Sequence, residues 1–192
     1  MKHQKSINKV SKAIFRDKGS KFYAFLHPVD SLDSYKYFIR RYKKDNPDAC
    51  HVCSAYRIYF NDWVDEYATD DGEPKGSSGL PILNALKQYC LVNTAIYVVR
   101  IYGGINLGIP GLIKAYNTSA LEAIADNNLI DWEPLTEVSI KYSYNLDKVV
   151  LLAIQSFEGK VVRQIFEEKI TSNIHIKKQF RNKSLPSPQS HV

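Results

Sequence analysis

The chain has 192 residues, of which 44% are hydrophobic, 12% aromatic and 24% charged. This composition is typical of a globular protein and excludes an intrinsically disordered chain, which has fewer apolar residues and more charge. The 26 Lys and Arg residues outnumber the 20 Asp and Glu residues, so the formal net charge is +6. A net positive charge is compatible with a polyanionic partner such as RNA. It is equally compatible with a protein whose charge only keeps it in solution.

Membrane and secreted classes are also excluded by the sequence. No apolar run approaches the roughly 18 residues that a membrane-spanning helix needs. The basic N-terminal residues are not followed by the apolar core of a signal peptide. Three cysteines, an odd number without a dense framework, fit a reducing compartment better than a disulfide scaffold. We therefore expect a cytoplasmic protein that does not bind membranes.

The first part of the chain alternates strand-like and helix-like segments. In chain order we expect a strand over 22–29, a helix capped by Ser31 that ends at Asn46-Pro47, a hairpin of strands over 53–60 and 63–68, a helix with Pro81 in its first turn, a buried strand over 95–102 and a helix over 112–125. Strands and helices in this order predict an α+β domain.

The pattern restarts near Asp131. We expect a strand of alternating residues from Val138 to Tyr144, a helix capped by Asn145 that runs to Phe157, and strands over 160–168 and 170–180. This order is most of a ferredoxin-like unit, whose last helix and edge strand are missing. The predicted domains are therefore 1–132, an incomplete ferredoxin-like domain over 133–180, and a polar, disordered tail over 181–192.

A glycine-rich segment is the first candidate for chemistry. It consists of Asp70, Asp71, Gly72, Glu73, Pro74, Lys75, Gly76, Ser77, Ser78 and Gly79. A glycine-rich turn before a helix N-terminus points N–H groups outward and favours an anion, and Lys75 adds a positive charge. The segment does not have the G-x-x-x-x-G-K-[ST] spacing of a Walker loop.

The three carboxylates of this segment leave its role open. An acidic cluster repels a bare phosphate unless a metal intervenes, and Asp70, Asp71 and Glu73 have the oxygen ligands that Mg²⁺ prefers. Alternatively, these carboxylates accept hydrogen bonds from loop N–H groups and stabilise the dipole of the next helix. We favour this structural role over an anion site or an RNA-backbone contact, and both over a metal site.

A second glycine-rich segment follows the expected buried strand. It contains Arg100, Gly103, Gly104 and Gly108. A buried arginine must find a carboxylate or several carbonyl groups. If the two segments meet at one end of the sheet, the carboxylates at 70, 71 and 73 are its natural partners, and a bidentate pair would hold both segments in place. The alternative is that Arg100 contacts a phosphate.

Two further patterns are weaker. Cys50 and Cys53 form a C-x-x-C, but no second ligand pair lies at zinc-finger spacing, and residues three apart on a strand point to opposite faces. His51 lies between them, without the strained elbow of a nucleophilic Ser or Cys. Basic residues from Lys160 to Lys183 alternate with apolar ones, which fits either an RNA-binding sheet face or a solvated face over a core.

Together, these segments resemble the IMPACT family. The resemblance rests on residues 19–22, 50–57, 70–74, 76–79, 81–82, 100–108, 111–112 and 115–116, in the family's order. It implies an N-terminal domain similar to the second domain of ribosomal protein S5 and a C-terminal domain similar to domain V of elongation factor G. The family's eukaryotic members regulate translation through protein contacts. The family usually has Lys at the position of Asn106 and Thr-Gly-Gly at the positions of residues 109–111.

These observations predict a non-enzymatic, translation-associated regulatory protein that binds RNA or a ribosome-linked protein partner. Contact is expected at a cleft between the two glycine-rich segments, and its candidate residues are Arg57, Lys75, Ser77, Ser78, Arg100 and Lys114. We expect no metal and no cofactor, and we assign no catalytic residue. One alternative is a metal-assisted hydrolase of a small phosphorylated substrate that uses His51 and the three carboxylates. The other is a pure protein-interaction module.

Overall fold

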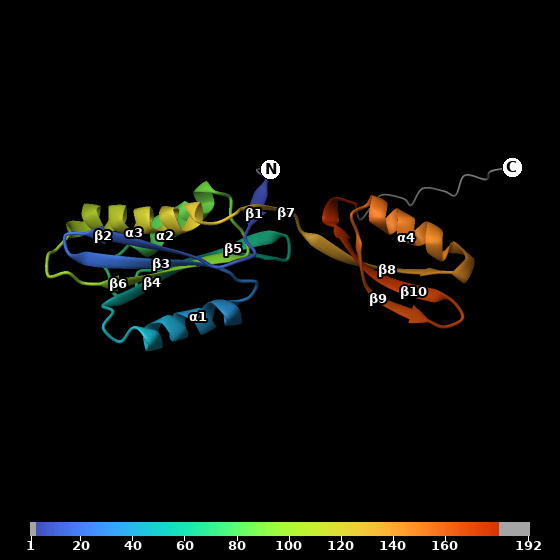
Figure 1. Cartoon of the computed structure of the whole chain (residues 1–192), viewed down its shortest axis with the longest axis horizontal. Coiled ribbons are helices and arrows are strands. Elements are labelled where there is room, and N and C mark those ends of the chain that lie inside the picture. The colour runs from blue at the N-terminus through green and yellow to red at the C-terminus, as the bar shows by residue number, and fades with distance from the viewer. Residues whose placement is uncertain (1–2, 181–192) are drawn as a thin grey trace. The chain divides into compact units, whose positions relative to one another are not determined.

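The computed structural model describes residues 3–180, which form two compact units divided between Trp132 and Glu133 (Figure 1). Helices and antiparallel sheets occur in both units, so the predicted α+β class is confirmed. The tail predicted over 181–192 lies outside the described residues. None of the described helices is both long and apolar enough to span a membrane.

A five-stranded antiparallel sheet forms the centre of the first unit. Its strands, in spatial order, are β2 (Ser11–Asp17), β3 (Ser20–Pro28), β6 (Thr94–Ile101), β4 (His51–Phe60) and β5 (Trp63–Thr69). The buried strand that the sequence predicts is β6, which lies in the middle. The β4–β5 hairpin turns at Asn61 and Asp62, whose φ angles of 46° and 73° are those of the two-residue turns that match strand twist.

Helices cover both faces of this sheet (Figure 1). On one face, α2 (Gly79–Gln88) and α3 (Gly108–Ala125) pack against the sheet and each other. On the other, α1 (Leu32–Asp45) packs over an aromatic cluster centred on Tyr97. Alternate residues of β6 therefore enter two different cores, which explains why this strand is apolar throughout rather than on one side.

Three strands of the first unit have no counterpart in the sequence prediction. They are β2, β1 (Gln4–Ser6) and β7 (Ile130–Trp132), and β1 pairs with β7 in a separate two-stranded sheet. In β2 the intermediate and exposed residues alternate at an edge of the sheet, with basic residues facing solvent. Such an edge strand has a weaker apolar signal than a central one.

The second unit is a three-stranded sheet with one helix. Its elements are β8 (Leu135–Tyr142), the 3₁₀ turn Tyr144–Leu146, α4 (Asp147–Ser156), β9 (Lys160–Phe166), β10 (Ile170–Lys177) and the 3₁₀ turn Lys178–Phe180. The strands are antiparallel in the order β8-β10-β9, and α4 packs over a core of isoleucines. This is the β-α-β-β part of the ferredoxin-like order, and residues 133–180 contain neither the second helix nor the fourth strand of that fold.

Several helix and strand ends differ from the predicted ones, and three of these differences have a clear local cause. Helix α3 begins at Gly108, four residues before the expected start, because Pro110 suits a first helical turn. Asn145 lies inside a 3₁₀ turn instead of capping α4, which begins at Asp147. Strand β10 ends at Lys177. The N–H of Lys178 still donates to the carbonyl of Pro134 in the register of the ladder, but proline has no N–H to return the bond.

Candidate functional site

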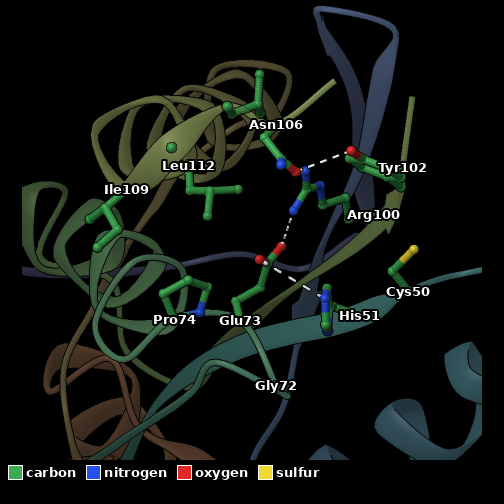
Figure 2. Close-up of a pocket in the computed structure, with 12 residues that line it drawn as sticks. Cys50, His51, Gly72, Glu73, Pro74, Arg100, Tyr102, Asn106, Ile109 and Leu112 are labelled. Carbon is green, nitrogen blue, oxygen red and sulfur yellow. Dashed lines mark hydrogen bonds and ion pairs between the residues drawn. The ribbon is translucent and has the colours of Figure 1, made fainter. Parts of the chain in front are cut away.

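The two glycine-rich loops, residues 70–79 and 102–108, line one pocket of about 520 Å³ (Figure 2). Strand direction explains why they meet. Strand β4 is antiparallel to both β5 and β6, so it begins where its neighbours end, and His51 at its start pairs with Arg100 near the end of β6. The predicted meeting of the loops at one end of the sheet is confirmed. The lining residues are Cys50, His51, Gly72, Glu73, Pro74, Arg100, Tyr102, Asn106, Leu107, Gly108, Ile109 and Leu112.

Arg100 and Glu73 form a buried ion pair between the loops. Arg100 Nη1 lies 2.7 Å from Glu73 Oε1, and the two side chains are only 7% and 4% exposed. The hydroxyl of Tyr116 on α3 donates to the same oxygen at 2.7 Å. Burial, joined by the nearby Cys53 and Glu73, raises the pKa of Tyr116 well above its ordinary value, so its proton stays in place. Of the two interpretations of Arg100, the structure therefore shows the carboxylate partner.

Asp70 folds the first loop onto the start of α2. Its carboxylate accepts the N–H groups of Gly76 (2.8 Å), Ser78 (3.1 Å) and Gly79 (2.8 Å). Burial by itself would raise the pKa of Asp70, but these hydrogen bonds outweigh it and hold the pKa below its ordinary value. The Asp70 carboxylate thus occupies the N–H groups that an external anion would need.

The serines of this loop are engaged in the same way, which corrects the prediction that they contact an anion. The hydroxyl of Ser78 donates to Asp70 Oδ1 at 2.7 Å, and the hydroxyl of Ser77 donates to the carbonyl of Pro74 at 2.7 Å. Both side chains are fully buried. The sequence alone places the two serines correctly before α2. It cannot show that the Asp70 carboxylate, six to nine residues upstream, accepts the N–H groups at the start of this helix.

Asp71 ties the loop to two other elements. One carboxylate oxygen accepts the N–H of Val52 at 2.8 Å, the other pairs with Lys43 on α1, and the Asp71 carbonyl accepts His51 Nδ1 at 2.8 Å. The carboxylates at 70, 71 and 73 thus bind different parts of the fold: the start of α2, then α1 and β4, and Arg100. Within residues 3–180, no group of three or more His, Cys, Asp and Glu side chains is arranged to hold a metal ion. This geometry does not support the hydrolase alternative.

Arg57 does not border the pocket, and its prediction as a contact residue there is wrong. It lies six residues along β4 from His51, which at about 3.3 Å per residue is about 20 Å away. Arg57 Nε pairs with Glu66 at 2.9 Å, and Nη1 donates to the carbonyl of Leu91 at 2.7 Å. Lys75 and Lys114 are exposed but do not line the pocket. Lys75 directly follows Pro74, and Lys114 lies two residues after Leu112; Pro74 and Leu112 both line the pocket.

The two cysteines of the C-x-x-C differ in environment. Cys50 is exposed and lines the pocket, whereas Cys53 is buried. The thiol of Cys53 donates to the carbonyl of Asp70 at 3.0 Å, and burial raises its pKa to about 12. Cys53 is therefore a core residue, as expected for a small buried cysteine.

The apolar side of the pocket was not predicted from the sequence. It consists of Pro74 in the first loop, Leu107 in the second loop, and Ile109 and Leu112 at the beginning of α3. The available signal was Ile109, which is apolar yet 53% exposed in the first turn of the helix. An unexpected helix start hid this signal, because residues 109–111 were assigned to the loop.

A third turn supports the second loop from outside the pocket. The β2–β3 turn at Lys18 and Gly19 packs directly on Gly103. A Cβ added at Gly103 would lie 1.9 Å from the carbonyl carbon of Gly19, so the two backbones touch. This contact places the exposed Lys18 beside the loop that forms one wall of the pocket.

Comparisons with known proteins agree with this architecture. Residues 18–124 match the Impact N-terminal domain. The chain is 43% identical over 105 residues to the IMPACT family member YvyE of Bacillus subtilis, a match that covers 55% of this chain and 48% of YvyE. It is 30% identical over 151 residues to YigZ of Escherichia coli, covering 78% of this chain and 74% of YigZ.

Among solved structures, the crystal structure of a hypothetical protein aligns with a TM-score of 0.70 and 26% identity, over 94% of this chain and 88% of that one. The alignment to YvyE spans about half of that protein's length. The matched segment, residues 18–124, contains both glycine-rich loops and every residue that lines the pocket. On these grounds the chain belongs to the IMPACT family.

Proposed function

We propose that this chain is a cytoplasmic, translation-associated regulatory protein that binds single-stranded RNA at the pocket between the two glycine-rich loops and catalyses no reaction. Membership of the IMPACT family supports the link to translation. The observation that carries the proposal is the pocket itself, which is preformed and has charged groups that already neutralise each other. An apolar lining with a few placed polar groups is typical of pockets that bind a ligand.

The charge around the pocket favours a polyanion. Exposed lysines stand on three elements next to its lining: Lys18 on the β2–β3 turn, Lys75 in the first loop and Lys114 on α3. Inside the pocket, the opposite charges of Glu73 and Arg100 compensate each other. Phosphates would therefore be attracted to the rim, while the interior would take an uncharged group. This division is typical of proteins that hold single strands by the backbone and bind unstacked bases in pockets.

A protein partner is the second candidate, and one observation favours it. Ile105, Ile109 and Ile113 are 55%, 53% and 42% exposed next to the same pocket. Clustered apolar side chains on a surface mark protein contacts more often than RNA contacts. A ribosome-linked protein would use these side chains and would remain bound after nuclease treatment.

Salt dependence of RNA binding tests the proposal. Affinity of the full chain for a labelled single strand should fall with salt with a log–log slope of about −0.7 for each phosphate contacted. The double variant Lys75→Gln/Lys114→Gln should lose affinity and reduce the slope by about 1.4. Lys36→Gln, an exposed lysine in the first half of α1 on the opposite face of the sheet, is the matched control. No binding at low salt rejects the proposal, and a partner retained after nuclease treatment supports the second candidate instead.

A further inference from the structure

The pocket has an apolar wall and a polar end. The wall is formed by Pro74, Leu107, Ile109 and Leu112, and the polar end by His51, Glu73, Arg100 and Asn106. Figure 2 shows Glu73 between Arg100 and His51, with Pro74, Ile109 and Leu112 on the other side. A ligand that fills this pocket must therefore be apolar on its faces and polar along one edge.

His51 presents a hydrogen-bond acceptor to the pocket. Its Nδ1 lies 2.8 Å from the carbonyl of Asp71, and a carbonyl can only accept, so Nδ1 carries the hydrogen. In the neutral ring this leaves Nε2 with a lone pair. The backbone of the first loop thus fixes the tautomer of His51.

Glu73 presents a second acceptor next to it. The hydrogen bonds that Glu73 receives from Arg100 and Tyr116 both end on Oε1. The other oxygen, Oε2, lies 4.0 Å from His51 Nε2, which is too long for a direct hydrogen bond. Two acceptors at this separation suit a ligand group that donates twice, with its nitrogen about 2.9 Å from each.

Asn106 adds a donor on the same side. Its Oδ1 accepts the hydroxyl of Tyr102 at 3.1 Å, which leaves the amide NH₂ to donate elsewhere. Asn106 is one of the residues that line the pocket, and Figure 2 shows its side chain bonded to Tyr102. The polar end therefore offers two acceptors, His51 Nε2 and Glu73 Oε2, and donors from the Asn106 amide and from the N–H groups of Arg100 that Glu73 does not accept. The matching ligand edge is an amino group beside a ring nitrogen that accepts.

Charge favours a neutral ligand over a cationic one. Because Arg100 compensates Glu73, the pocket has no net negative charge to offset the desolvation of an ammonium or guanidinium group. A flat, neutral, amino-bearing ring buries its faces against the apolar wall and keeps its polar edge satisfied. On the Watson–Crick edge, cytosine and adenine have an amino group beside a ring nitrogen that accepts. On the same edge the amino group of guanine lies beside a ring N–H, which donates, and uracil has no amino group.

We infer that the pocket binds an unstacked cytosine or adenine base of single-stranded RNA through His51, Glu73 and Asn106. The inference rests on the proposed function, and it adds a base preference that phosphate contacts alone do not supply. Oligocytidylate and oligouridylate of equal length test it directly, since the two strands have the same backbone charge and differ only along the edge of the base.

The measurement is fluorescence anisotropy with the full chain at about pH 8. Oligocytidylate should bind about tenfold more tightly than oligouridylate, because uracil leaves the acceptors of the pocket unpaired. Asn106→Asp replaces the amide donor with an acceptor on an exposed residue and should remove most of the difference. His51→Leu should do the same, with thermal unfolding as the check that the variant is folded.

The outcomes separate this inference from the proposed function. Equal binding of the two strands, with the expected salt slope, overturns the base pocket and leaves RNA binding intact. Absence of binding to either strand overturns both. A cytidine preference that persists unchanged in Asn106→Asp and in folded His51→Leu overturns the assignment to this pocket.

Discussion

The guanidinium of Arg100 lies 2.7 Å from the carboxylate of Glu73, and both side chains are more than nine-tenths buried. This pair joins the end of β6 to the first glycine-rich loop. Removal of one member of a buried pair leaves a charge without compensation, which costs about 3–5 kcal/mol. The pocket therefore depends on the pair for its shape, even if the pair adds little net stability to the fold.

Glu73→Gln should accordingly lower the free energy of unfolding by about 3 kcal/mol, because the amide keeps the size of the side chain but leaves Arg100 uncompensated. Urea denaturation followed by circular dichroism measures the change. Glu122→Gln on the exposed side of α3 is the control and should have almost no effect. A cost below about 1 kcal/mol for Glu73→Gln would mean that Arg100 finds water or another acceptor instead.

Asp70→Ala should destabilise the protein by about 2 kcal/mol, since one carboxylate accepts three backbone N–H groups at the start of α2. The effect should depend on pH. The folded-state pKa of Asp70 is lowered from its ordinary value of 3.8, so its contribution is complete above that value and is lost as the pH falls through the lowered pKa.

Urea denaturation of the wild type and of Asp70→Ala at a series of pH values tests this. The difference between the two proteins should be constant from neutral pH down to about pH 4 and shrink below it. A difference that grows on acidification would contradict the assignment. Asp126→Ala, at the exposed end of α3, is the control.

The sequence predicted the elements that carry a strong apolar period and the loops that connect them. The centre of the first unit was predictable because Ala95 to Val99 are apolar without interruption and the next loop begins with glycines. The meeting of the two loops followed from strand direction alone. Arg57 was misplaced because a basic residue near a motif in sequence can lie a full strand length away in the fold.

What the sequence could not supply was the partner of each polar group. Three acids in four residues look like a cluster, yet the fold directs them to α2, to α1 and β4, and to Arg100. The direction of each side chain is set by local backbone angles, such as the positive φ of 43° at Asp71, that composition does not specify. The likeness to ribosomal protein S5 and to elongation factor G stays a prediction from the family resemblance.

His27 should make the stability of the protein sensitive to mild acid. Its ring packs against Phe38 and Tyr97 and bonds to the hydroxyl of Tyr42 at 2.7 Å. Burial, with smaller effects of nearby Arg41 and Lys12, lowers the pKa of His27 from 6.5 to about 4. Between these values the unfolded chain binds the extra proton, so stability falls as the pH is lowered.

Between pH 7 and pH 5, His27 should lower the free energy of unfolding of the wild type by about 2 kcal/mol. His27→Phe has no ionisable ring at this position. Its free energy of unfolding should therefore fall by about 2 kcal/mol less over the same interval, whatever its value at pH 7. Denaturation of both proteins at the two pH values gives the comparison. Identical pH dependence in the two proteins would show that folding does not lower the pKa of His27.

Gly103 and Gly104 differ in what a side chain would meet. A Cβ at Gly103 would lie 1.9 Å from the Gly19 carbonyl carbon and 2.2 Å from the nitrogen of Ser20, both backbone atoms. At Gly104 nothing lies within 4 Å, and the only obstacle is a φ of +83°. Gly104→Ala should therefore lower the free energy of unfolding by about 1–2 kcal/mol. Gly103→Ala should lower it clearly more, because the new Cβ would push the second loop away from the β2–β3 turn. Thermal unfolding ranks the two variants, and an equal cost would show that the β2–β3 turn moves freely.

Cys50 offers a chemical probe of the pocket. It is exposed and lines the pocket, whereas Cys53 is buried and burial raises its pKa to about 12. Iodoacetamide should therefore modify Cys50 in the native protein, while Cys53 should react only after denaturation, because the thiolate is the reactive form. Peptide mass spectrometry measures each rate separately.

A base bound in the pocket should protect Cys50. Saturating oligocytidylate should slow its alkylation several-fold, oligouridylate at the same concentration should slow it less, and the rate at Cys90 should not change, since Cys90 follows α2 and does not line the pocket. Because the two strands carry equal charge, a difference between them cannot arise from phosphates attracted to the rim. Saturating RNA that leaves the Cys50 rate unchanged would show that the strand binds elsewhere on the protein.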